Sequence, residues 1–122
     1  MNEKKQIGDR AERLALRYLK RQGVRIQERN VYNRGGEIDL IGRDQGTLVF
    51  FEVRYRGETS LGNGAESIDP GKKRRLLRAV EFYLHRNQLW QADVRIDVIA
   101  IEPDGHNQFR IDWIRNAIQG ST

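Results

Sequence analysis

A hairpin-like segment in the first half of the chain constrains the fold more than any other feature. Residues 35–56 read GGEIDLIGRDQGTLVFFEVRYR, which is two apolar runs joined by RDQG. Apolar runs around a short loop that contains glycine are typical of two antiparallel strands. Charged residues nevertheless interrupt both runs, namely Glu37, Asp39, Glu52 and Arg54. The segment therefore predicts a strand pair whose acidic side chains need a chemical explanation.

The register of this hairpin decides where the charged side chains point. A loop of two or four residues within positions 43–46 places Asp39 opposite Phe50. The same register places Glu37 opposite Glu52. Since side chains alternate between the two faces of a strand, one face then carries Glu37, Asp39, Glu52 and Arg54. Asp39 would lie diagonal to Glu52, about 7–8 Å away between Cα atoms, so that both carboxylates could contact one cation.

Two helices are predicted on either side of the hairpin. Apolar residues at helical spacing predict a helix over residues 7–22, which Gly23 ends. The pair Asp69-Pro70 has the pattern of a capping residue followed by proline at the first helical position. This second helix is expected to run to about Asn87.

The remaining patterns predict a single α/β domain over residues 1–122. Strands are predicted in VRIQERNVY before the hairpin and in DVRIDVIAI and FRIDWI after the second helix. We therefore expect a central mixed sheet of four to five strands flanked by helices. Residues 116–122 are expected to form a frayed tail.

Composition limits the environment and the metal chemistry. The chain has no cysteine, which excludes disulfides and thiolate metal sites. No segment approaches the roughly 20 apolar residues that span a bilayer, and the first residues lack the apolar run of a secretory signal. We therefore expect a cytoplasmic protein with no membrane partner. The formal net charge of +5 suits a nucleic acid as partner, and it also suits a merely soluble basic protein.

One acidic residue of the first helix lies on its apolar side. At about 100° per residue, the apolar residues occupy an arc from about 340° to 180°, and Glu12 falls at about 140°. A carboxylate directed at a core needs a cation, several donors or a metal ion, and an ion pair with a strand arginine is the simpler alternative. Glu12, Asp39 and Glu52 together form a candidate set of oxygen ligands, which suits Mg²⁺ or Mn²⁺ better than zinc.

A dense basic run, KKRRLLR, opens the second helix at residues 72–78. We expect Lys72, Lys73 and Arg74 to contact phosphates, together with Arg56 at the end of the hairpin. The alternative for the lysines is an ordinary surface position in which the stem is buried and the ammonium group is solvated.

These motifs together resemble the YraN-like family of small bacterial proteins, which are predicted endonucleases. The resemblance is carried by GDRAERLALRYL, Arg29-Asn30, GGEIDLI, LVFFEVRYR, SIDPGKKRRL, RIDVIAI and WI. That family is similar to the PD-(D/E)XK nucleases and to Holliday-junction resolvases. The resemblance implies a restriction-endonuclease-like fold, with Asp39 and Glu52 at the two acidic strand positions and Glu12 as the helical glutamate. It also implies a homodimer, because a junction presents symmetric strands.

The sequence departs from this pattern at Arg54, where the acidic-x-Lys triplet of the nucleases has its lysine. Lysine can lose a proton when it is desolvated, whereas arginine effectively cannot. Arg54 could still orient a phosphate or stabilise developing negative charge. The family pattern favours Lys72 as the lysine that replaces it.

The leading hypothesis is metal-dependent phosphodiester hydrolysis on branched or otherwise structured DNA. Glu12, Asp39 and Glu52 would hold Mg²⁺ or Mn²⁺, and Arg54 and Lys72 would complete the catalytic set. One alternative is a non-catalytic nucleic-acid-binding module with a decayed nuclease site, which Arg54 motivates. A second alternative is a structural or assembly protein in which Glu12 and Arg54 form a plain ion pair.

Overall fold

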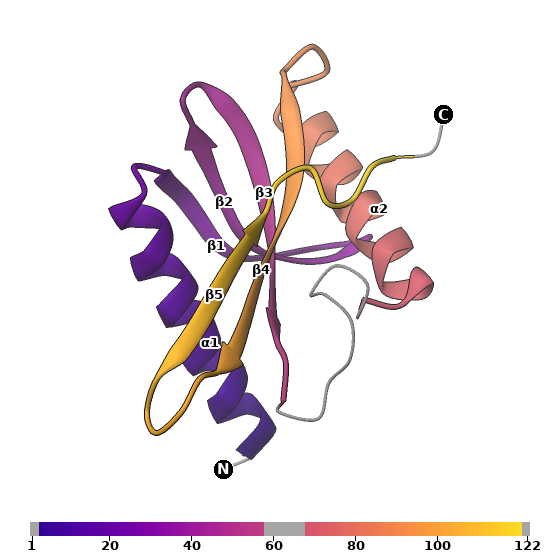
Figure 1. The fold of residues 1–122 in the computed structure, drawn as a ribbon. Helices are drawn as coiled ribbons and strands as arrows, with labels where there is room; N and C mark the ends of the chain where they lie inside the picture. Colours follow the sequence, from indigo (N-terminus) through magenta and orange to yellow (C-terminus); the bar gives the residue numbers. More distant parts are fainter. Residues whose placement is uncertain (1–2, 58–67, 121–122) are drawn as a thin grey trace.

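A five-stranded mixed sheet with one helix packed on each face forms the core of the molecule (Figure 1). The computed structural model describes residues 3–57 and 68–120. In chain order the elements are α1 (Glu3–Arg21), β1 (Arg25–Asn33), β2 (Gly36–Asp44), β3 (Thr47–Tyr55), α2 (Pro70–Arg86), β4 (Val94–Pro103) and β5 (Phe109–Ile114). The α/β class and the five-stranded mixed sheet predicted from the sequence are confirmed.

The strands lie in the sheet in the same order as in the chain, β1-β2-β3-β4-β5. β1, β2 and β3 form an antiparallel meander, and β5 is antiparallel to β4. β3 and β4 run parallel, and the chain between them contains α2. A parallel pair requires such a crossover, because its strands begin at the same edge of the sheet. The crossover places the first turn of α2 beside β3, where Lys72 reaches Glu52.

Two apolar layers hold the helices against the sheet. On one face Ala15 and Leu19 of α1 pack with Phe51 of β3. On the opposite face of the sheet, Leu76 and Ala79 of α2 pack against apolar residues of β2 and β3. Successive residues of β3 thus enter opposite layers, which is the alternation expected of a central strand covered on both sides.

The ends of the helices follow the sequence signals. At the end of α1, Gly23 has φ 92°, its N–H donates to Lys20 O, and the N–H of Val24 donates to Leu19 O. This is a glycine-terminated Schellman arrangement. At the start of α2, the Asp69 side chain accepts a hydrogen bond from Lys72 N at 2.9 Å. Both helix boundaries that the sequence predicted at these positions are confirmed.

The β2–β3 hairpin has a two-residue loop, Gln45-Gly46, in which both residues have positive φ. Asp44 pairs with Thr47 and Ile41 pairs with Phe50, so the expected Asp39–Phe50 pairing is wrong by two residues. The difference arises in the turn itself. Because both central residues of this turn have positive φ, the loop lies one residue later in the chain than expected. A shift of two residues alone would preserve which side chains share a face. The pairing ends at Leu40, however, and Ile38 and Leu40 pack in opposite layers, so the predicted single face for the charged residues is wrong at Glu37.

The end of the chain packs against the sheet instead of fraying. Residues 115–120 form no helix, but Ala117 N donates to Ile96 O at 2.9 Å. Ile118 is buried in the layer that contains α2. The expectation of a frayed tail is therefore wrong as far as Ile118, and residues 121–122 lie outside the described part. Within the described ranges, no helix is both long enough and apolar enough to cross a membrane.

Candidate functional site

Asp39 lies where β2 and β3 stop pairing with each other. The paired residues run from the turn to Leu40 and Phe51. Beyond that point Val53 N donates to Asp39 Oδ2 at 2.8 Å, while β3 continues in parallel beside β4 as far as Tyr55. The carboxylate of Asp39 thus takes a backbone donor that would otherwise belong to the strand ladder. This places an acidic side chain between two strands in the middle of the sheet.

Three acidic side chains from two elements meet at this point. One carboxylate oxygen from each of Glu12 on α1 and Glu37 and Asp39 on β2 lies within 4.8 Å of the other two. Burial, first, and the negative charge of Glu52, second, raise the pKa of Asp39 to about 8. Clustered carboxylates repel one another, and a hard divalent cation relieves that repulsion. The acidic group therefore fits Mg²⁺ or Mn²⁺, which prefer oxygen ligands.

Glu12 supplies a second sign of an incomplete site. Burial raises the pKa of Glu12, and a hydrogen bond with the Asn30 side chain acts in the opposite direction. The buried Oε1 atom of Glu12 has no hydrogen-bond partner among the described residues. A buried carboxylate oxygen without a donor is unfavourable, and it is the kind of atom that a cation would satisfy.

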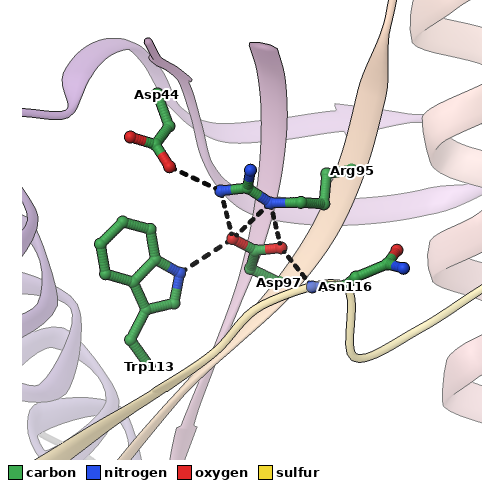
Figure 2. Close-up of polar contacts among 5 residues, drawn as sticks. All are labelled: Asp44, Arg95, Asp97, Trp113 and Asn116. Atoms are coloured by element: carbon green, nitrogen blue, oxygen red, sulfur yellow. Dashed lines mark hydrogen bonds and ion pairs between the residues drawn. The ribbon is translucent and has the colours of Figure 1, made fainter.

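The sheet buries another carboxylate, Asp97 of β4, and there supplies donors to both oxygens (Figure 2). Oδ1 accepts from Asn116 N at 2.8 Å, and Oδ2 accepts from Trp113 Nε1 at 2.8 Å. The guanidinium of Arg95 contacts both oxygens and also reaches Asp44 Oδ2 at 2.8 Å. This network joins β4 to the end of β2 and to the chain after β5. Its complete pairing identifies Asp97 as structural and sets the acidic group at Asp39 apart from it.

Glu52 and Lys72 are in direct contact on the wall of a cavity next to the acidic group. Glu52 is only 2% exposed, and Lys72 Nζ lies 2.6 Å from its Oε1. The distance makes this contact an ion pair. Its angles do not meet the geometry of a hydrogen bond, so Oε1 accepts none among the described residues. The cavity has a volume of about 160 Å³, and it is lined by Gly36, Glu37, Asp39, Glu52, Lys72, Arg75 and Leu76. The acidic group and the lysine thus open onto the same space.

The structure brings together most of the residues that the sequence selected. Glu12 and Asp39 are in the acidic group, whereas Glu52 lines the cavity beside it and is paired with Lys72. Arg54, two residues further along β3, shares the face of Glu52 by alternation and is half-buried.

The predicted phosphate-binding residues divide into two groups. Lys73 is half-buried and Arg74 is exposed in the first turns of α2, near Lys72. Arg56 is only 8% exposed, and its Nη1 lies 3.6 Å from Glu102 Oε2 on β4. A buried guanidinium paired with a carboxylate is poorly placed to meet DNA, so we omit Arg56 from the proposed phosphate contacts.

Glu37 is the member of the acidic group that the sequence did not select as a ligand. Its only sequence signal was its position two residues before Asp39. The alternation of β2 breaks at Asp39, because Ile38 packs in the layer of α2 and Leu40 packs in the layer of α1. A break of this kind depends on the neighbouring strand, so the residue pattern of β2 does not reveal it.

The sheet, its two flanking helices and its acidic group are consistent with a restriction-endonuclease-like fold. The chain belongs to the Uncharacterised protein family UPF0102, whose family model matches residues 11–101. This range contains every residue of the acidic group and Lys72. The family resemblance inferred from the sequence is thereby confirmed.

Relatives in several bacteria are similar over almost the whole chain. A UPF0102 protein of Marinobacter nauticus is 53% identical over 115 residues, which cover 94% of each chain. One of Vibrio cholerae is 45% identical over 113 residues, which cover 91% of this chain and 90% of the relative. One of Carboxydothermus hydrogenoformans is 37% identical over 115 residues, which cover 94% and 97%.

Proposed function

We propose that this protein is a metal-dependent nuclease that hydrolyses phosphodiester bonds in branched or otherwise structured DNA. The observation that carries the proposal is the convergence of Glu12, Glu37 and Asp39 within 4.8 Å, beside the Glu52–Lys72 pair. Both oxygens of buried Asp97 have donors, whereas the buried Oε1 of Glu12 has none among the described residues. The clustering of three carboxylates around that atom supports a site that is completed by a cation.

The acidic group would hold one Mg²⁺ or Mn²⁺ ion through Glu12, Glu37 and Asp39, with Glu52 at the neighbouring wall of the cavity. Such an ion, when bound, supplies positive charge beside a phosphate and promotes the ionisation of water. Asp39 is half-buried, so protein replaces water on one side of the group, which strengthens the electrostatic interactions there.

The basic residues of the chain would position the DNA. Glu52 keeps the ammonium group of Lys72 over the cavity, where it can donate to a phosphate oxygen or to the leaving oxygen. Arg54 can bind phosphate through its guanidinium, although it is a poor proton donor or acceptor. Lys73 and Arg74 extend the positive charge along α2. In this proposal the protein acts in the bacterial cytoplasm.

The test is cleavage of a panel of four-way junction, flap and linear DNAs with Mg²⁺ or Mn²⁺. We expect cleavage of at least one structured DNA by the wild-type protein. The double variant Asp39→Asn/Glu52→Gln should lose it, whereas Asp104→Asn, in the exposed loop after β4, should not. Cleavage that is equal in the wild type and the double variant would reject the proposal.

A non-catalytic DNA-binding module is the second candidate, and Arg54 in place of the triplet lysine favours it. This candidate predicts binding in EDTA that weakens steeply with salt and is unchanged in the double variant. A homodimer is part of the nuclease proposal alone, because two sites would act on the symmetric strands of a junction. Light scattering of the protein, with and without a junction DNA, measures the molecular mass and therefore the number of subunits.

A further inference from the structure

Asn30 of β1 has a backbone conformation that is unusual inside a strand. Its φ is 51°, whereas strand residues have φ of about −120° to −140°. Four other described residues besides the glycines have positive φ, and all four lie outside the helices and strands. The left-handed region is unfavourable for residues that carry a Cβ atom, and asparagine is among the residues that tolerate it best. A conformation of this kind, held in place by its surroundings, is typical of functional sites.

Asn30 lies at the point where the acidic group forms. The β1–β2 register pairs each neighbour of Asn30 with the corresponding neighbour of Asp39, so the two residues lie opposite each other. The side-chain alternation of β2 breaks at Asp39, so both strands are irregular at the same place. The side chain of Asn30 forms a hydrogen bond with Glu12 of α1. The irregular part of β1 thus presents an amide group to the acidic group.

The hydrogen bond from Asn30 holds the Glu12 carboxylate and leaves one of its oxygen atoms available. Glu12 Oε1 is buried and has no hydrogen-bond partner among the described residues. Burial raises the pKa of Glu12, and the bond with Asn30 opposes this rise, because an amide N–H stabilises the charged carboxylate. Carboxylates that bind metal ions are commonly hydrogen-bonded in this way by a neighbouring residue. Glu12 therefore has the arrangement expected of an oriented ligand.

Tyr32, two residues further along β1, makes the corresponding contact with the other glutamate of the acidic group. It pairs with Glu37 across the ladder, and a hydrogen bond joins its hydroxyl to the Glu37 side chain. Glu37 is exposed, so without such a bond its side chain would be free to rotate away from Asp39. Val31 packs in the layer of α2, so Asn30 and Tyr32 both lie on the side of the sheet that carries α1.

We propose that β1 orients the two glutamates of the acidic group for metal binding. Asn30 holds the carboxylate of Glu12. Tyr32 does the same for Glu37. Both are positioning residues, and holding the carboxylates in advance reduces the rotamer freedom that metal binding would otherwise remove. Asp39 needs no such partner, because a backbone N–H of β3 already holds it. The inference rests on the proposed function and identifies the strand that assembles its metal site.

The test measures the affinity of the purified protein for Mn²⁺ alone by titration calorimetry, so it does not depend on cleavage. Asn30→Gly permits the left-handed backbone and removes the amide, and it should weaken Mn²⁺ binding about 10- to 100-fold. The urea midpoint in EDTA should stay close to that of the wild type. A merely structural role would instead lower the midpoint and leave the affinity unchanged. Asn107→Gly is the matched control, since Asn107 has φ 58° in the exposed loop before β5, and it should change neither quantity.

Tyr32→Phe tests the second contact without disturbing the core. It removes only a hydroxyl group, from a side chain that is 69% exposed. Mn²⁺ binding should weaken about 10-fold, and the urea midpoint in EDTA should not change. Tyr18→Phe removes a hydroxyl from a ring that packs edge-on against Trp113, and it should bind Mn²⁺ as the wild type does. If Asn30→Gly or Tyr32→Phe keeps the wild-type affinity, the inference is overturned.

Double variants decide whether each residue acts through its glutamate. In a Glu12→Gln background, Asn30→Gly should cause little further loss of Mn²⁺ affinity, because the carboxylate that it holds is already gone. Tyr32→Phe should likewise cause little further loss in a Glu37→Gln background. Losses that add in full would mean that the residues of β1 act independently of the glutamates, which would also overturn the inference.

The outcome is distinguishable from the fate of the nuclease proposal. A wild-type protein that binds no Mn²⁺ would reject the metal site and the nuclease with it. Mn²⁺ binding that Asn30→Gly and Tyr32→Phe leave unchanged would reject the role of β1 and leave the nuclease intact. Mn²⁺ binding that depends on these two residues, without cleavage of any DNA, would reject the nuclease and retain the oriented metal site.

Discussion

The ammonium group of Lys72 lies 2.6 Å from Oε1 of Glu52, so that α2 places a cation directly against a strand carboxylate. The lysine comes from the first turn of the helix, where Asp69 caps the backbone N–H of the same residue. The cap and the ion pair thus fix both ends of Lys72. In the proposed nuclease this arrangement supplies the lysine that the strand itself lacks at Arg54.

The first prediction concerns this lysine. Lys72→Met should reduce DNA cleavage by about 100-fold or more, because it removes a positioned proton donor and a positive charge. Single-turnover cleavage of a junction or flap DNA is the measurement. Lys73→Met is the matched control, since it removes the neighbouring lysine of the same basic run, and it should weaken DNA binding modestly without this loss. A similar loss in both variants would indicate that the lysines contribute charge alone.

The second prediction concerns the dependence of stability on pH. The pKa of Asp39 is about 8 in the folded protein, against an ordinary value of 3.8, so the folded state retains a proton that the unfolded state has lost between these pH values. The metal-free protein should therefore lose stability as the pH rises from about 4 to 8. Asp39→Asn should remove much of this loss and be more stable than the wild type at pH 8.5, by about 2 kcal/mol.

Urea unfolding at pH 5 and pH 8.5 in EDTA measures this effect. Asn can still accept the hydrogen bond from Val53 N through its side-chain oxygen, so the strand contact is preserved. If Asp39→Asn is less stable than the wild type at pH 8.5, the carboxylate is not under the repulsion described above.

The third prediction concerns metal binding without DNA. Mn²⁺ should raise the Tm of the wild-type protein, because an ion that binds only the folded state stabilises it by about 2.7 kcal/mol at 100 times Kd. Glu12→Gln and Asp39→Asn should each reduce the shift, and Asp104→Asn should retain it. Differential scanning calorimetry with and without Mn²⁺ is the measurement, and an equal shift in all four proteins would place the ion elsewhere.

The fourth prediction concerns the paired carboxylate. Asp97→Asn should destabilise the protein by about 2–4 kcal/mol, since an amide nitrogen would face the N–H donor of Trp113 or Asn116 and Arg95 would keep only Asp44 as a carboxylate partner. Asp112→Asn, on the exposed side of β5, should change stability by less than about 0.5 kcal/mol. The urea midpoint of each variant measures the difference.

The sequence predicted the features that depend on short stretches of chain. The helical wheel placed Glu12 on the inner side of α1 because its period is a local property, and the structure half-buries this residue. The single face predicted for Glu37, Asp39, Glu52 and Arg54 followed from alternation, and it does not hold across the break in β2 at Asp39. The pairing of β2 with β3 was wrong by two residues, because the positive φ values of Gln45 and Gly46 are not evident from the letters RDQG.

Features that depend on contacts between distant segments were missed. A Cβ atom on Gly35 would come within 2.4 Å of Ala79 N, so α2 packs directly on the β1–β2 turn, and no local pattern shows this contact. The position of Glu37 in the acidic group follows from the break in β2 at Asp39, which in turn needs β3 as the donor of Val53 N–H. The sequence predicted no packing for the tail, because Ile118 is buried in a layer that other elements form.

The order of the elements along the chain separates the proposed chemistry from its support. Every residue of the acidic group and Lys72 precedes β4, whereas β4 and β5 contribute packing and the Asp97 network. During synthesis, all the proposed ligands would therefore leave the ribosome before β4 does. At that stage the edge of β3 that pairs with β4 would still be uncovered. We expect the nascent chain to acquire metal affinity only when β4 docks, which would keep an unfinished nuclease inactive.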